Sequence, residues 1–139
     1  MKNLGNLIAG VTLMATCFLF SQTALAQAKP AGKPWDVKAE GAKLKSTATG
    51  ADAVAAGKEI WAKECKSCHG AKGLGDGAKA EKIDISCNDF SKKTVQAQSD
   101  GELYYKTTEG RKPMPSFKEK LSDSERWQVV AYLRTLAAK

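Results

Sequence analysis

The run Cys65-Lys66-Ser67-Cys68-His69 constrains what this chain can fold into more than any other stretch. Two thiols three positions apart, followed at once by a histidine, form the attachment signature of a c-type haem. Each thiol can bond to one of the two vinyl groups on a porphyrin edge, and the adjacent imidazole can then bind the iron. The run therefore predicts one covalent haem c with its iron, and it requires helices that bury a porphyrin.

Residues 1–26 have the features of a secretory signal peptide. Lys2 supplies a positive start, Leu7–Phe20 is an almost uninterrupted apolar run, and Ala24-Leu25-Ala26 provides small residues for cleavage. We therefore expect an exported protein, cleaved after Ala26 and located in the periplasm, where such haems are attached. An uncleaved membrane anchor is the alternative, because the apolar run approaches the minimum length that spans a bilayer.

The rest of the chain divides into an arm, residues 27–50, and a helical domain, residues 51–139. The arm contains Pro30 and Pro34 and shows no sustained periodicity, which predicts a flexible or extended segment. Trp35 is unusual there, because a large aromatic residue in a tether is wasted unless it packs on the domain. An exposed Trp35 is the other interpretation.

Three segments of the domain have the marks of helices, and none has the marks of a strand. Apolar residues recur at helical spacing from Asp52 to about Cys65. Two capping boxes, Ser99–Glu102 and Ser122–Glu125, begin later helices. Gly57 lies inside the first helix at a cost of about 1 kcal/mol relative to alanine, which indicates that another part of the molecule packs closely there. The predicted class is all-α.

A second iron ligand is expected at Met114. His69 is the only histidine of the chain, and Met114 is the only methionine after the predicted cleavage site, so lysine and water are the other donors open to the iron. Pro113 and Pro115 restrict the backbone on both sides of Met114, which suits a ligand that must keep one distance from the iron. A methionine that only fills the core is the alternative.

Taken together, these motifs resemble those of a class I monohaem cytochrome c. The resemblance runs from about Ala51 to the C-terminus, which is most of the chain after cleavage. It rests on Cys65–His69, on the glycine-rich loop 70–77, on the pair Met114-Pro115 and on the last helix with Glu125–Leu133.

The resemblance implies how the site and the helices are built. Cys65 and Cys68 would carry the haem, with His69 and Met114 as axial iron ligands, in a cytochrome c fold of three to five helices around one haem. In such proteins the N- and C-terminal helices cross where a glycine of the first faces an aromatic residue of the second. The positions that match this crossing are Gly57, Trp61, Val129 and Tyr132.

Two features depart from the pattern of the family. Many members carry a proline soon after the glycine loop, near the carbonyl that accepts a hydrogen bond from the histidine ligand, whereas Ala78 follows Gly77 here. The group that orients His69 is therefore open. Cys87 has no counterpart in the motifs of the family, and we expect a free thiol there, with an intermolecular disulfide as the alternative.

The expected function is electron transfer between respiratory redox partners rather than enzymatic catalysis, because a His/Met haem leaves no open iron position for a substrate. The net charge of +7 favours partner proteins with acidic docking surfaces. No small-molecule substrate or nucleic acid is expected, and contact with a membrane is expected only through partners or an uncleaved anchor. The lysines expected to surround the haem edge and steer partners are Lys63, Lys66, Lys72, Lys79, Lys112 and Lys118.

The sequence leaves three alternatives open. The chain can be a haem-bearing subunit of a larger redox complex, or a sensor or enzyme in which Met114 detaches from the iron. A zinc-binding module is the third, because Cys65, Cys68, His69 and Cys87 contain suitable donors. Adjacent residues such as Cys68 and His69 rarely both reach one metal, which makes zinc the weakest of the three.

Overall fold

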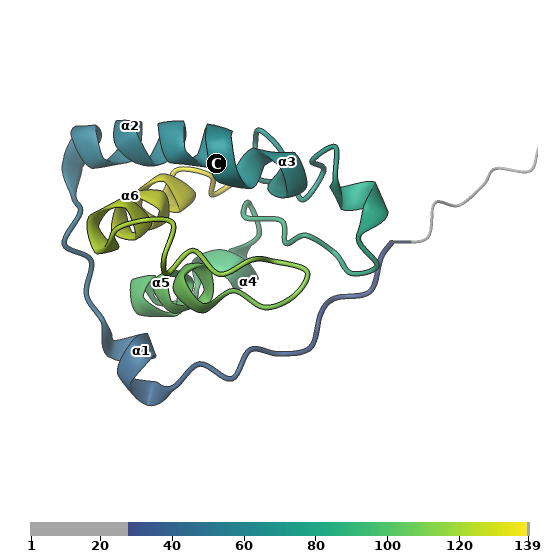
Figure 1. Cartoon of the computed structure of the whole chain (residues 1–139), viewed down its shortest axis with the longest axis horizontal. Coiled ribbons are helices and arrows are strands. Elements are labelled where there is room, and N and C mark those ends of the chain that lie inside the picture. Colours follow the sequence, from purple (N-terminus) through teal and green to yellow (C-terminus); the bar gives the residue numbers. More distant parts are fainter. Residues whose placement is uncertain (1–27, 139) are drawn as a thin grey trace, which may run out of the picture.

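The computed structural model describes residues 28–138 and is helical (Figure 1). The long helices are α2 (Gly50–Ile60), α5 (Asp100–Glu109) and α6 (Asp123–Arg134). Helix α2 continues through the π-helical turn η1 (Trp61–Cys65) into α3 (Lys66–His69). The short helices are α1 (Ala39–Lys43), the 3₁₀ turn η2 (Ala80–Lys82) and α4 (Lys93–Gln96). No strand forms among the described residues, so the all-α prediction is confirmed.

Both predicted capping boxes are present and begin the helices expected of them. The Ser99 side chain accepts a hydrogen bond from the backbone of Glu102, and Ser122 does the same for Glu125. Each glutamate side chain in turn accepts from the backbone of its serine. These reciprocal bonds satisfy backbone groups that a helix start otherwise leaves unpaired. Helix α5 then stops at Gly110, whose φ of 61° lies in the left-handed region.

Helices α2 and α6 pack directly against each other at Gly57. A Cβ atom added to Gly57 would lie 1.9 Å from the carbonyl oxygen of Gln128 and 3.0 Å from the Cβ of Tyr132. Only a residue without a side chain allows so close an approach of the two backbones. One turn later, the rings of Trp61 and Tyr132 lie 5.8 Å apart between centroids. The close packing predicted at Gly57 is thus confirmed, and it explains an otherwise costly glycine inside a helix.

Replacing Gly57 with alanine is expected to lower the free energy of unfolding by about 1–3 kcal/mol, the usual cost of overpacking. The new methyl group has no space beside Gln128 unless α2 and α6 move apart. Chemical denaturation of the haem-bearing protein measures the change. Ala55, an exposed residue of the same helix, provides the control, since Ala55→Ser should cost no more than about 0.5 kcal/mol. Equal stability of the Gly57→Ala protein and wild type would contradict this packing.

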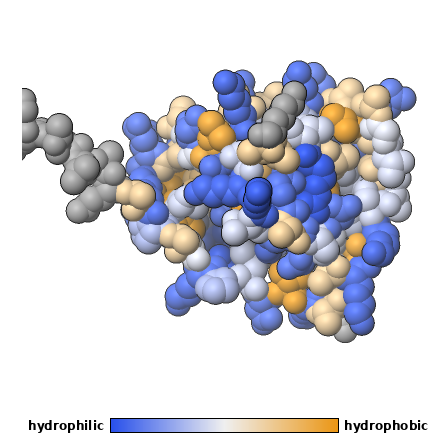
Figure 2. All heavy atoms as spheres, turned by 180° about the vertical axis from the view of Figure 1, so that it is seen from behind, coloured by the Kyte–Doolittle hydropathy of each residue, from blue (hydrophilic) through white to orange (hydrophobic). Residues whose placement is uncertain are grey.

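The surface is mainly hydrophilic on the face opposite to that of Figure 1. Figure 2 shows blue residues across most of this face and hydrophobic residues only in small, separate patches. The exposed large hydrophobic residues of the described chain are Leu44 and Leu74, each 44% exposed. Because these two are far apart in sequence and isolated singles are normal on protein surfaces, neither marks an interface.

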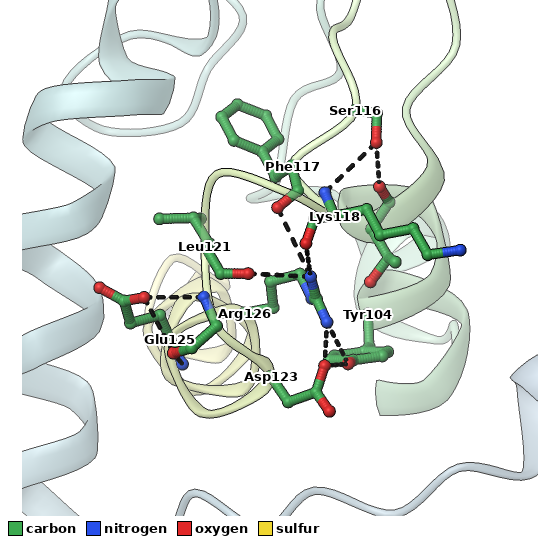
Figure 3. Close-up of polar contacts among 10 residues, drawn as sticks. Tyr104, Ser116, Phe117, Lys118, Leu121, Asp123, Glu125 and Arg126 are labelled. Carbon is green, nitrogen blue, oxygen red and sulfur yellow. Dashed lines mark hydrogen bonds and ion pairs between the residues drawn. The ribbon is translucent and has the colours of Figure 1, made fainter.

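The buried Arg126 connects α6 to α5 and to the segment that leads out of the Met114 turn (Figure 3). Its guanidinium donates to the carbonyl oxygens of Lys118 (2.7 Å) and Leu121 (2.9 Å) and to the hydroxyl of Tyr104 (3.0 Å). It also forms an ion pair with Asp123. A buried charge is costly unless its donors are paired; both terminal nitrogens of Arg126 are paired here, whereas its Nε has no hydrogen-bond partner. The network therefore holds the chain after Met114 between the two helices.

Residues 28–38 have no regular secondary structure and run along the domain until they reach α1 (Figure 1). The sequence shows no periodicity that predicts α1, which packs on α5: a Cβ at Gly41 would lie 2.9 Å from the ring of Tyr105. The Ser99 hydroxyl donates to the carbonyl of Ala42 at 2.9 Å.

The predicted signal peptide, residues 1–26, lies outside the described residues. Within residues 28–138 no helix combines the length and apolar character needed to cross a membrane.

Candidate haem site

The Cys-x-x-Cys-His run lies where the first long helix changes its winding. Helix α2 gives way to the π-helical turn Trp61–Cys65, and the short helix α3 then contains Cys68 and ends at His69. Single π-helical turns of this kind occur frequently at functional sites. Gly70, with φ of 83°, ends α3 and turns the chain away from the helix.

The glycine-rich loop folds back onto α3 and holds it in place. The backbone N–H groups of Gly75, Gly77 and Lys79 donate to the carbonyls of His69 (2.9 Å), Cys68 (3.2 Å) and Ser67 (2.7 Å), respectively. A Cβ at Gly77 would lie 2.5 Å from the carbonyl oxygen of Ser67, so a side chain there would push the loop off the helix. The loop accordingly holds the backbone from which the Cys68 thiol and the His69 imidazole extend.

The four residues predicted to bind the haem and its iron line one cavity. Cys65, Cys68 and His69 reach it from the end of the first helix, and Met114 reaches it from the turn between α5 and α6. The cavity has a volume of about 320 Å³, within the range of about 300–1,000 Å³ typical of ligand sites. The large apolar residues of the wall include Trp61, Phe90, Phe117, Val129 and Leu133.

The imidazole of His69 lies among aromatic rings. Its ring centroid is 5.7 Å from that of Trp61 and 5.2 Å from that of Phe90, which it meets edge-on. Burial lowers the pKa of His69, while the backbone of Cys87 acts in the opposite direction. A neutral imidazole is the form that binds a metal.

The backbone of Cys87 lies close enough to the His69 ring to act on its pKa. The Nδ1 atom of His69 is buried, and no hydrogen bond to it meets the usual limits of distance and angle. The Cys87 backbone therefore acts as a polar neighbour of the ring rather than as a full hydrogen-bond acceptor. The sequence leaves the orienting group of His69 open, and the fold brings the backbone of Cys87, ten positions beyond the glycine loop, toward the ring.

The thiol of Cys65 is in surroundings that disfavour its charged form. Burial, together with nearby Glu64 and Cys68, raises the pKa of Cys65 to about 12. A thiolate would be unstable there, whereas a thioether carries no charge and fits an apolar wall. The donors and the apolar wall therefore fit a haem bonded through Cys65 and Cys68, which would supply an iron that changes oxidation state.

Met114 lies in a tight turn that the fold holds from several sides. Its backbone N–H donates to the carbonyl of Arg111 at 2.9 Å, and its half-buried side chain packs on the hydrophobic core. Beyond Pro115, the Ser116 hydroxyl donates to the carbonyl of Thr108 at 2.7 Å, and the Phe117 backbone donates to the same carbonyl at 3.2 Å. Met114 thus lines the cavity from a turn that is anchored at both ends.

Several residues of the cavity wall are not predicted by any sequence motif. Residues 31–35 of the arm, together with Lys106 and Arg111, line the same cavity as the four predicted residues. Trp35 is the one signal in the sequence, because a large aromatic residue in a proline-containing arm suggests packing. Arg111 has no such signal, since an arginine in a basic loop is usually solvated.

The zinc alternative finds no support in the geometry. Cys65, Cys68 and Cys87 form no disulfide with one another, and a free thiol at Cys87 stays a prediction. Among residues 28–138, no three or more histidine, cysteine, aspartate or glutamate residues are arranged to hold a metal ion.

Comparison with known proteins agrees with a haem site. The model of the family described as cytochrome c oxidase, cbb3-type, subunit III matches residues 52–133, more than half of the chain. No curated protein sequence matches the chain. Among solved structures, a chain of the Kuenenia stuttgartiensis reducing HAO-like protein complex Kustc0457/Kustc0458 is 33% identical, with a TM-score of 0.61. The match covers 70% of this chain and 49% of that one, so it spans about half the length of that relative.

A second solved structure, the KustC0563 c-type cytochrome, is 28% identical with a TM-score of 0.53. That match covers 59% of this chain and 98% of the other. The fold and the site thus define a monohaem c-type cytochrome. The chain belongs to the family of cytochrome c oxidase, cbb3-type, subunit III. Its cofactor is covalently bound haem c with iron, and its chemistry is haem-based electron transfer.

Proposed function

We propose that this chain is an exported, periplasmic electron carrier whose single haem c is bonded to Cys65 and Cys68 and ligated by His69 and Met114. The observation that carries the proposal is the shared cavity of about 320 Å³, which these four side chains line together with an apolar wall. A haem with both axial positions taken exchanges electrons and has no room at iron for a substrate. The chain is accordingly proposed to act as a carrier rather than as an enzyme.

Two features support Met114 as the sixth ligand. Its thioether lines the cavity together with His69, and the turn that carries it is held by hydrogen bonds on both sides. A thioether stabilises ferrous iron relative to ferric iron and raises the reduction potential above that of a His/His haem. The apolar wall acts in the same direction, because it disfavours the additional positive charge of ferric haem.

Respiratory partners with acidic docking surfaces are proposed from the charge of the surface. The six lysines expected near the haem edge are all exposed, and such charges speed the encounter with an oppositely charged partner. The small size of the hydrophobic patches in Figure 2 also favours a charged over an apolar interface on that face. Export to the periplasm follows from the predicted signal peptide and from the compartment in which such haems are attached.

A second candidate is a haem-bearing subunit of a larger redox complex. The description of the matching family names a subunit of an oxidase, and one matching structure is a component of a protein complex. Affinity capture of the chain from its native membrane and periplasmic fractions separates the two candidates. A carrier is recovered alone, whereas a subunit is recovered with fixed stoichiometric partners.

Absorption spectroscopy and redox titration of the exported protein test the proposal itself. We expect a Soret band that survives acid–acetone extraction, one reversible one-electron transition, and only slow carbon monoxide binding by the resting ferrous protein. An extractable haem would contradict attachment at Cys65 and Cys68. Rapid binding of carbon monoxide would contradict a closed iron site and favour the sensor or enzyme with a labile Met114.

A further inference from the structure

The start of the described chain lies across the haem cavity, outside the region that the family model matches. The model begins at residue 52, yet residues 31–35 line the cavity together with His69 and Met114. We call residues 29–35 the strap. The strap lies outside the domain that the family shares, so its own contacts indicate its role.

The first half of the strap is held along the segment that follows the glycine loop. The Lys29 ammonium donates to three backbone carbonyls, those of Ala80 (2.7 Å), Glu81 (2.8 Å) and Ile83 (2.6 Å). The backbone N–H of Ser86 donates to the carbonyl of Pro30 at 2.9 Å. Charge-assisted bonds to backbone carbonyls are a specific way to hold a segment that has no helix or strand.

The second half is held by a single side chain, Arg111. Its guanidinium donates to the carbonyls of Lys33 (2.6 Å) and Pro34 (2.9 Å). It also lies over the ring of Trp35, with its central carbon 4.5 Å from the ring centroid, which is a cation–π geometry. One arginine thus engages three consecutive residues of the strap, and both Arg111 and Trp35 are half-buried.

Arg111 is also part of the turn that carries Met114. The carbonyl of Arg111 accepts the backbone N–H of Met114 at 2.9 Å, and the two residues form an isolated bridge. The contacts that hold the Arg111 side chain therefore also restrict the backbone beside Met114. The strap and the Met114 turn form adjacent parts of one cavity wall.

We propose that Trp35 and Arg111 are positioning residues that clamp the Met114 turn and close the cavity wall beside the sixth ligand. The proposal rests on His69/Met114 ligation as proposed above. Neither Trp35 nor Arg111 binds the iron. They act by keeping Met114 in place and by keeping water away from it. Loss of the clamp gives Met114 more freedom to leave the iron, so external ligands gain access.

The test compares Trp35→Ala and Arg111→Gln with wild type, all as haem-bearing exported proteins. The rate of carbon monoxide binding to the ferrous protein is expected to rise at least about tenfold in both variants, the change that about 1.4 kcal/mol produces. The red absorption band of thioether-ligated ferric haem should weaken in parallel. Trp35→Phe retains an aromatic face for Arg111 and should stay near wild type. Lys38→Ala removes an exposed charge of the arm and serves as the matched control.

Hydrogen exchange of the Ser86 amide gives a readout of the strap that does not depend on iron ligation. This amide is expected to be protected in wild type and to exchange faster in Trp35→Ala. An unprotected Ser86 amide in wild type, or carbon monoxide rates in both variants equal to that of Lys38→Ala, would overturn the proposal. If Trp35→Ala does not accumulate as a folded protein, the carbon monoxide rate of Arg111→Gln alone tests the proposal. A wild-type protein without the thioether band would instead overturn His69/Met114 ligation, so the two failures are distinguishable.

Discussion

Replacing Cys65 and Cys68 together with alanine is expected to abolish covalent haem attachment and to leave the chain largely unfolded. The haem serves as core as well as cofactor, because residues of α3, α6 and the Met114 turn line the cavity that it would fill. A domain of this small size buries too little apolar surface to compensate for the loss of so large a group. Circular dichroism of the purified double variant should show loss of most of the helical signal and no cooperative thermal transition.

Cys87, the cysteine outside the attachment run, provides the control for that experiment. Cys87 also lines the cavity, but it lies outside the attachment run, so Cys87→Ala should retain the haem and the helical signal. A haem-free double variant with native-like helix and a cooperative melt would show that the protein fold does not depend on the porphyrin.

Replacing Met114 with alanine is expected to open one axial position of the iron. The ferrous variant should bind carbon monoxide rapidly, whereas the wild type should bind it only slowly. The reduction potential should fall by on the order of 0.1 V, a modest part of the roughly 0.8 V over which axial ligands set haem potentials. The fall follows from the loss of a thioether that stabilises ferrous iron. Potentiometric titration measures it.

Lys112 provides the matched control, because it is an exposed residue of the same turn. Lys112→Ala alters the charge of the turn but removes no donor from the cavity, so its potential should stay close to that of wild type. Unchanged potential and unchanged ligand binding in Met114→Ala would mean that Met114 only fills the core, the alternative that its sequence position leaves open.

Features that depend on neighbours in sequence were predictable. The two capping boxes begin their helices because a serine and a glutamate three positions apart bond within one turn. Gly57 was predicted to lie at a close contact because a glycine inside a helix is costly. The contact is with the backbone of α6. Cys65–His69 was recognisable for the same reason, because its spacing is local.

Features set by contacts between distant segments were not predictable. Lys29 bonds to carbonyls more than fifty positions away, and Arg111 bonds to the strap over an even longer separation. Backbone carbonyls carry no sequence signature, so no pattern reveals which side chain will reach them. The buried Arg126 is a similar case: its three carbonyl acceptors come from the fold of the chain after the Met114 turn. The sequence leaves the neighbour of His69 open, because the approach of this neighbour depends on the course of residues 78–87.

Proton NMR of the ferrous protein tests the central claim most directly. Met114 is the only methionine after the predicted cleavage site, so a methionine methyl signal of the processed chain can come from no other residue. Ligation of its sulfur to haem iron places this methyl group above the porphyrin, where the ring current shifts it far upfield of all other protein signals. We predict one such three-proton signal in wild type and its absence in Met114→Ala. A Met114 methyl signal in the ordinary range for methionine would contradict His69/Met114 ligation.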